Sequence, residues 1–136
     1  MIWFTNFLSA AIIASIPLLF ATLGEILTEK VGNLNLGVEG MMLMGAIAGF
    51  LIGNVTNNPV IAIIGAFGMG ACGALIYGFL TITLRANQVV SGLALTTLGT
   101  GFASMLGKSQ VGVSVAEKVT VLSNKIAIPL LSKIPV

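Results

Sequence analysis

The sequence predicts an all-α integral membrane protein with about four transmembrane helices and a C-terminal loop segment. Three observations lead to this fold class. Only 7% of the 136 residues are charged, against about a quarter in soluble domains, so charges are too few to cover a water-facing surface. Hydrophobic residues make up 57% of the chain, and the mean hydropathy is +1.09. The apolar residues also fall into long runs, as a bilayer requires, because crossing it takes about 20 helical residues.

Three of the predicted spans, at 2–26, 60–84 and 89–106, are long enough or nearly long enough to cross the hydrocarbon core. The first contains Pro17, which we expect to kink the helix, because proline cannot donate a hydrogen bond to the carbonyl four residues earlier. From residue 107 the pattern changes, and the lysine-bearing sequence 107–136 is predicted to be a partly amphipathic loop.

The remaining span, at 38–52, is predicted to be short, with polar residues directly before it. At 1.5 Å per residue it gives about 22 Å of helix, less than the ~30 Å of the hydrocarbon core. Residues 33–37 would then lie at membrane depth, where irregular backbone is tolerated only inside protein or beside a wet cavity. We expect Asn35 to cap the helix and Glu39 to lie in its first turn, where the helix dipole favours a carboxylate. The second span therefore has a broken start.

Polar side chains gather at the starts of the second and fourth spans, and we take them as candidate pathway residues. An ionisable residue within a membrane segment points to a function. Amide and hydroxyl groups are also what a sugar-like solute would need along its path. The candidates are Asn33, Asn35, Glu39, Asn87, Gln88 and Ser91. The alternative that these residues only cap helices at the interface stays open, and Glu25 and Glu29 are expected in the headgroup region.

Small residues recur at every fourth position within the spans, a pattern typical of helices that pack closely in lipid. In the second span they are Gly45, Gly49 and Gly53, and in the third they are Ala62, Ala66, Gly70, Ala74 and Gly78. These stripes predict a compact bundle of helices rather than isolated membrane anchors.

Several classes of function are disfavoured by residues that the sequence lacks. There is no Asp and no His, which removes most metal sites, Ser-His-Asp catalysis and the usual proton shuttles. No phosphate-binding loop of the GxxxxGK[ST] type is present, and no nucleophile and base can be paired, so we expect no enzyme, no catalytic residue, no metal and no cofactor. The net charge of +2 comes from scattered residues, which argues against nucleic acid as a partner.

Three stretches of the sequence resemble a known family. The run GEILTEKVGNLNLGVEGMMLMGAIAGF resembles the first part of the permease subunits of ABC importers, in the group that carries branched-chain amino acids, ribose and nucleosides. Within it, NLNLGVEGMMLMGA looks most like the nucleoside or simple-sugar branch. The run NQVVSGLALTTLGTGFASMLG is similar to the following segment of that branch, and IAIPLLSKIPV resembles the external loop before its next span. The resemblance covers nearly the whole chain.

This resemblance implies a multi-pass subunit of the bacterial cell membrane that forms part of a translocation pathway for a nucleoside or simple sugar. The partners it implies, besides the lipid bilayer, are a second permease subunit, cytoplasmic subunits that bind and hydrolyse ATP, and an extracellular solute-binding protein or lipoprotein. The six candidate residues match polar positions of the two motifs.

One departure from the family bears on the mechanism. Such permeases are longer and carry a cytoplasmic coupling helix, typically with a run like GENPxAAxxxGI, which nothing in this sequence matches. We therefore expect a permease truncated before the coupling helix. The alternative is a small four-helix secondary transporter that works as a homodimer and uses a membrane glutamate to exchange protons for a cationic solute. A third possibility is a scaffold subunit without transport.

Overall fold

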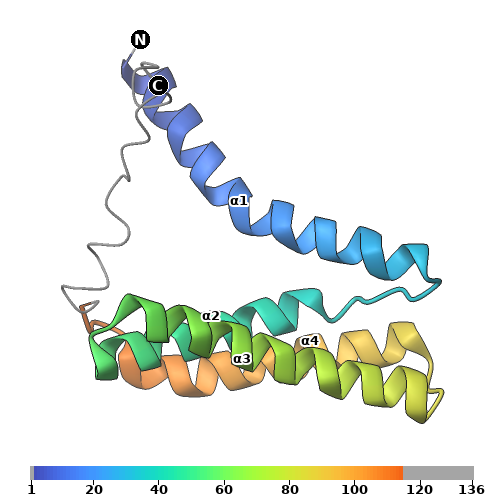
Figure 1. Cartoon of the computed structure of the whole chain (residues 1–136). Coiled ribbons are helices and arrows are strands. Elements are labelled where there is room, and N and C mark those ends of the chain that lie inside the picture. The colour runs from blue at the N-terminus through green and yellow to red at the C-terminus, as the bar shows by residue number, and fades with distance from the viewer. Residues whose placement is uncertain (1, 115–136) are drawn as a thin grey trace.

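The computed structural model describes residues 2–114, and these form four long helices without a β-strand among them (Figure 1). The helices are α1 (Ile2–Lys30), α2 (Val38–Thr56), α3 (Pro59–Gly78) and α4 (Gln88–Gly107). A π-helical turn (Phe79–Thr83) extends α3, and a 3-10 turn (Lys108–Gln110) follows α4. All four helices are long and apolar enough to cross a membrane, which confirms the predicted fold class.

The second span is longer than predicted. α2 contains 19 residues, or about 28 Å of helix, and it continues to Thr56, past the predicted end at residue 52. The connection to α3 consists of Asn57, which takes a left-handed conformation, and Asn58, whose side chain accepts a hydrogen bond from the Val60 N–H. This local capping closes one helix and opens the next within two residues. Much of the predicted C-terminal loop, residues 115–136, lies outside the described residues.

α1 diverges from the other helices and bends partway along its length (Figure 1). Pro17 lies inside this helix, and proline is the usual cause of such a bend, as the sequence predicts. Most side chains of α1 are exposed, including the large apolar groups of Trp3, Phe4 and Phe7. An exposed apolar surface of this kind is suited to lipid or to other membrane helices.

The other three helices pack together, with α2 lying against both α3 and α4 (Figure 1). Two glycines allow the backbones of α2 and α4 to approach each other closely. A Cβ atom added at Gly40 would lie 2.5 Å from the Leu95 carbonyl oxygen, and one added at Gly99 would collide with the backbone of Gly40. The two helix backbones therefore touch at this crossing, as small residues in membrane helices allow.

The contact between α2 and α3 uses only part of the predicted small-residue stripe. Cβ atoms added at Gly45 and Gly49 would each lie 3.1 Å from an atom of Ala66. Further along α3, Gly73 faces α2, whereas Gly70 has open space in the described part of the chain. The reason is geometric: each step of four residues turns a helix by about 40°, so a stripe with that spacing rotates away from a neighbouring helix. Of the other small residues, Gly53 is buried, Gly78 is half-buried and Ala74 is exposed.

Candidate functional site

The connection between α1 and α2, residues 31–37, is irregular backbone, and we call it the 31–37 segment. Its second residue, Gly32, has a φ of +81°, a left-handed conformation that glycine adopts without strain. The N–H of Gly32 donates to the Glu29 carbonyl at 2.9 Å, and the N–H of Asn33 donates to the Thr28 carbonyl at 3.0 Å. These bonds close the end of α1 and reverse the chain direction.

Leu34 is bound from two sides by side chains of two different helices. Its N–H donates to Gln88 Oε1 on α4 at 3.0 Å, and its carbonyl accepts a hydrogen bond from the Tyr77 hydroxyl on α3 at 2.7 Å. Gln88 Nε2 also donates to the carbonyl of Gly32 at 3.3 Å. The Tyr77 hydroxyl lies 3.0 Å from Asn33 Oδ1 as well, and since a phenol carries one proton it donates to one of these two oxygens at a time.

The second half of the segment is bound in the same manner. The Asn35 N–H donates to Glu25 Oε1 on α1 at 2.7 Å, and the carbonyl of Leu36 accepts from Thr96 Oγ1 on α4 at 2.7 Å. Asn35 itself is buried, and its Oδ1 accepts the N–H of Gly37 at 2.9 Å. Side chains thus satisfy backbone groups along most of the segment, which is what irregular backbone at membrane depth requires.

The prediction that Asn35 caps α2 is wrong in its geometry. The cap residue is Gly37, which makes no side-chain capping bond, and Asn35 lies two residues earlier. An asparagine in that position closes a local turn onto the backbone two residues on, as the bond to Gly37 shows.

The other candidates lie in three different settings. Glu39 lies in the first turn of α2, as expected, and is exposed. Asn87 caps α4, because its Oδ1 accepts the N–H groups of Val89 and Val90 at 3.0 and 3.2 Å. Ser91 is buried next to Gly92, where an added Cβ would lie 2.8 Å from the Leu36 nitrogen. The structure therefore brings Asn33, Asn35 and Gln88 together at the 31–37 segment, while Asn87 and Glu39 make none of the hydrogen bonds described for that segment.

Two residues of this cluster escaped sequence reasoning. Tyr77 lies in a long uncharged span and looks like one more apolar membrane residue. A phenol in such a span needs a hydrogen-bond partner, and this need could have indicated its role from the sequence. Glu25 was expected among lipid headgroups, but its carboxylate bonds to the backbone of Asn35 and accepts from the Thr28 hydroxyl at 3.1 Å.

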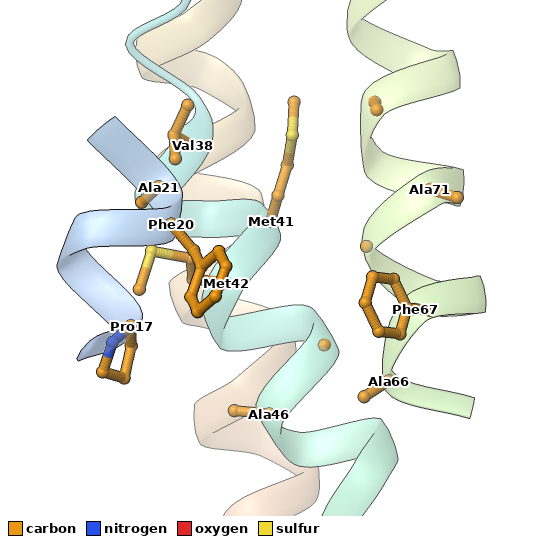
Figure 2. Close-up of a pocket in the computed structure, with 13 residues that line it drawn as sticks. Pro17, Phe20, Ala21, Val38, Met41, Met42, Ala46, Ala66, Phe67 and Ala71 are labelled. Atoms are coloured by element: carbon orange, nitrogen blue, oxygen red, sulfur yellow. The ribbon is translucent and has the colours of Figure 1, made fainter. Parts of the chain in front are cut away.

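An apolar groove of about 730 Å³ lies between α1, α2 and α3 (Figure 2). The labelled lining residues are Pro17, Phe20 and Ala21 from α1, Val38, Met41, Met42 and Ala46 from α2, and Ala66, Phe67 and Ala71 from α3. Such a lining offers hydrocarbon contact and no side-chain hydrogen bonds. It does not suit a nucleoside or a sugar, whose recognition needs convergent polar groups.

Comparison with known proteins identifies the chain. A family model described as branched-chain amino acid transport system, permease component, matches residues 7–128, which is most of the sequence. The chain belongs to this permease family. Together with four apolar helices, the match makes the permease chain a multi-pass protein of the cell membrane.

Individual relatives of the permease chain are transporter subunits by name. It is 47% identical over 112 residues to a putative glucose ABC transporter permease protein of Haloferax volcanii, covering 79% of this chain and 33% of that protein. It is 31% identical over 133 residues to a guanosine ABC transporter permease protein of Bacillus subtilis, covering 93% and 42%. A nucleoside ABC transporter permease protein of Lactococcus lactis is 28% identical over 134 residues, covering 92% and 41%. The permease chain thus spans between a third and about two fifths of the length of these curated relatives, and no solved structure matches it significantly.

The capping geometry makes a prediction for Asn87 in the permease chain. Replacing Asn87 by Ala is expected to lower the free energy of unfolding by about 1 kcal/mol, since two N–H groups of α4 lose their acceptor. Replacing it by Ser is expected to retain most of the stability, because a serine hydroxyl also caps helices. The check is the melting temperature of each variant in lipid nanodiscs. Equal melting of the Ala variant and the unchanged protein would contradict a capping role.

Proposed function

We propose that this chain forms part of the translocation pathway of an ATP-driven importer for a nucleoside or a simple sugar. The observation that carries the proposal is the 47% identity to a permease named for glucose transport, over 79% of the chain. The relatives named for guanosine and nucleoside transport support the same solute classes, which share a ribose or hexose ring rich in hydroxyl groups.

The proposal assigns ATP binding and hydrolysis to partner subunits in the cytoplasm, and solute capture to an external solute-binding protein. A second permease subunit would complete the pathway. The chain itself would then act without catalysis. Membership of the permease family supports partners of these general kinds.

Among the candidates, Glu39 is the residue best placed to meet a solute or another subunit. On α2, Gly40 faces α4, and Gly73 of α3 faces Met41. Glu39 is turned by about 100° from Gly40 and by about 160° from Met41, so it points away from both neighbouring helices. A carboxylate on an exposed membrane-helix face is costly unless it borders a polar path or a protein partner. Asn35 and Gln88 would then shape the path by holding backbone, and Asn33 by accepting from the Tyr77 hydroxyl, rather than by binding the solute.

Uptake by intact cells tests the proposal. The gene for this chain would be deleted in its own host, and uptake of labelled guanosine and labelled glucose would be measured with and without complementation. We expect the deletion to abolish uptake of at least one of them and the gene to restore it. We also expect depletion of ATP to stop uptake, and collapse of the proton gradient at constant ATP to leave it. The reverse pattern would favour the proton-coupled alternative, and unchanged uptake after deletion would refute both.

Substitution of Glu39 tests the pathway assignment. Glu39→Ala is expected to lower uptake about tenfold or more, because hydrogen bonds to charged groups contribute about 1.5–3 kcal/mol. Glu39→Gln keeps a hydrogen-bonding group and separates the need for charge from the need for an acceptor. The matched control is Glu29→Gln, an exposed glutamate at the end of α1. Unchanged uptake by both Glu39 variants at normal amounts of membrane protein would contradict the assignment.

A further inference from the structure

We propose that Tyr77 is a positioning residue for transport: its hydroxyl, acting with the Gln88 amide, fixes the 31–37 segment and thereby the position of Glu39. The inference rests on the proposed function, since it names residues that shape the pathway of the same transporter. It concerns a residue outside the polar motifs, buried in the helix bundle.

Tyr77 is held by protein contact, unlike nearby residues of α3 and of the π-helical turn that follows it. It is 3% exposed, whereas Leu75 is 73% and Phe79 is 56% exposed. The burial places its hydroxyl 2.7 Å from the Leu34 carbonyl, 43 residues away in the sequence. The backbone of Tyr77 is fixed as well, because the Thr81 hydroxyl in the following π-helical turn donates to its carbonyl at 2.9 Å.

Tyr77 and Gln88 bind the two polar backbone groups of one residue. The Tyr77 hydroxyl, on α3, donates to the carbonyl of Leu34. The Gln88 side-chain oxygen, on α4, accepts the N–H of Leu34. Two anchors on the peptide groups that flank one Cα atom fix both the position and the rotation of that backbone. Within a bilayer no water replaces a lost partner, so release of either group is unfavourable.

The backbone between Leu34 and Glu39 is also restrained. Asn35 accepts through its Oδ1 the N–H of Gly37, which is the N-cap residue of α2. Gly37 is itself confined, because an added Cβ would lie 3.0 Å from Leu95 Cδ2. A displacement of Leu34 is therefore transmitted to Gly37 and to Glu39 in the first turn of the helix.

Hydrogen–deuterium exchange tests directly whether Tyr77 fixes the 31–37 segment. The measurement is made on the protein in lipid nanodiscs with any subunits that co-purify. In Tyr77→Phe, the amides of residues 31–37 are expected to exchange about tenfold faster, since the partly buried carbonyl of Leu34 loses its donor. The matched control is Thr97→Val, which removes a hydroxyl of α4 that bonds back to the Leu93 carbonyl of its own helix. The turn at residues 57–58 serves as an internal reference. Unchanged exchange at 31–37, or an equal increase in every helix, would contradict the claim that Tyr77 fixes this segment.

Transport kinetics then separate positioning from plain stability. At matched amounts of protein in the membrane, Tyr77→Phe is expected to raise the KM for uptake about tenfold, as is Gln88→Ala. The double variant is expected to raise KM by less than the product of the two effects, because both act through Leu34. A fall in Vmax at constant KM would show a structural role only and would overturn the positioning role. If the unchanged protein transports neither guanosine nor glucose, the proposed function fails and the positioning role in transport fails with it. Hydrogen–deuterium exchange still decides whether Tyr77 fixes the 31–37 segment.

Discussion

Gly99→Ala is expected to cause a large loss of folded protein, because it forces apart a crossing at which the backbones of α2 and α4 touch. The added Cβ would collide with the carbonyl oxygen and Cα of Gly40 on α2. A backbone cannot swing aside as the end of a side chain can, so α4 has to move as a unit. Overpacking in a tight core costs about 1–3 kcal/mol and sometimes more, and we expect the upper end of that range here. The measurement is the melting temperature and the yield of monodisperse protein in detergent.

Gly101→Ala is the matched control for this substitution. It makes the same chemical change on the same helix, two residues later, where an added Cβ meets nothing within 4 Å in the described part of the chain. Since alanine favours helix by about 1 kcal/mol over glycine, this variant is expected to be as stable as the unchanged protein or more so. Equal melting temperatures for the Gly99 and Gly101 variants would contradict the backbone contact between α2 and α4.

The membrane helices themselves were predictable because the ability to span a bilayer is a local property of sequence. Length and apolar composition decide it, and no distant residue has to be known. The ends were less predictable. Thr56 lies beyond the predicted end of the second span at residue 52 but belongs to α2, and its hydroxyl bonds back to the Ile52 carbonyl at 2.6 Å, which satisfies it within the helix. Polar composition alone therefore placed the end of α2 too early.

The polar cluster was only partly predictable, because its bonds connect residues far apart in the sequence. Polarity in an apolar context drew attention to Asn33, Asn35 and Gln88, which the structure places at the 31–37 segment. The same residue type serves to bind a solute or to hold backbone, so composition left their role open. That Gln88 holds Leu34, 54 residues away, depends on α4 packing beside α2. Tyr77 was missed for a related reason, since only the fold shows that its ring is buried and its hydroxyl is aimed at Leu34.

Glu25→Ala is expected to weaken the attachment of α1 to the rest of the molecule. α1 packs lightly on its neighbours, and the Glu25 carboxylate gives it a charge-assisted hydrogen bond of 2.7 Å to the Asn35 N–H. Asn35 is buried, so removal of its acceptor leaves a backbone donor without water to replace it. The loss of such a bond, with one partner left buried, is expected to lower the free energy of unfolding by about 2 kcal/mol. Thermal unfolding in lipid nanodiscs measures this loss, and faster hydrogen–deuterium exchange at Asn35 would locate it.

Two further variants decide whether the effect comes from this hydrogen bond. Glu25→Gln keeps an oxygen that can accept from Asn35 but lacks the charge, so we expect it to recover roughly half of the lost stability, since charge-assisted bonds are about twice as strong as neutral ones. Glu29→Ala removes a carboxylate one turn later on an exposed part of α1 and is expected to change little. If Glu25→Ala and Glu29→Ala unfold at the same temperature, the carboxylate does not anchor α1. If Gln fails to recover any stability while Ala is destabilised, the charge itself stabilises the 31–37 segment, and its acceptor geometry is secondary.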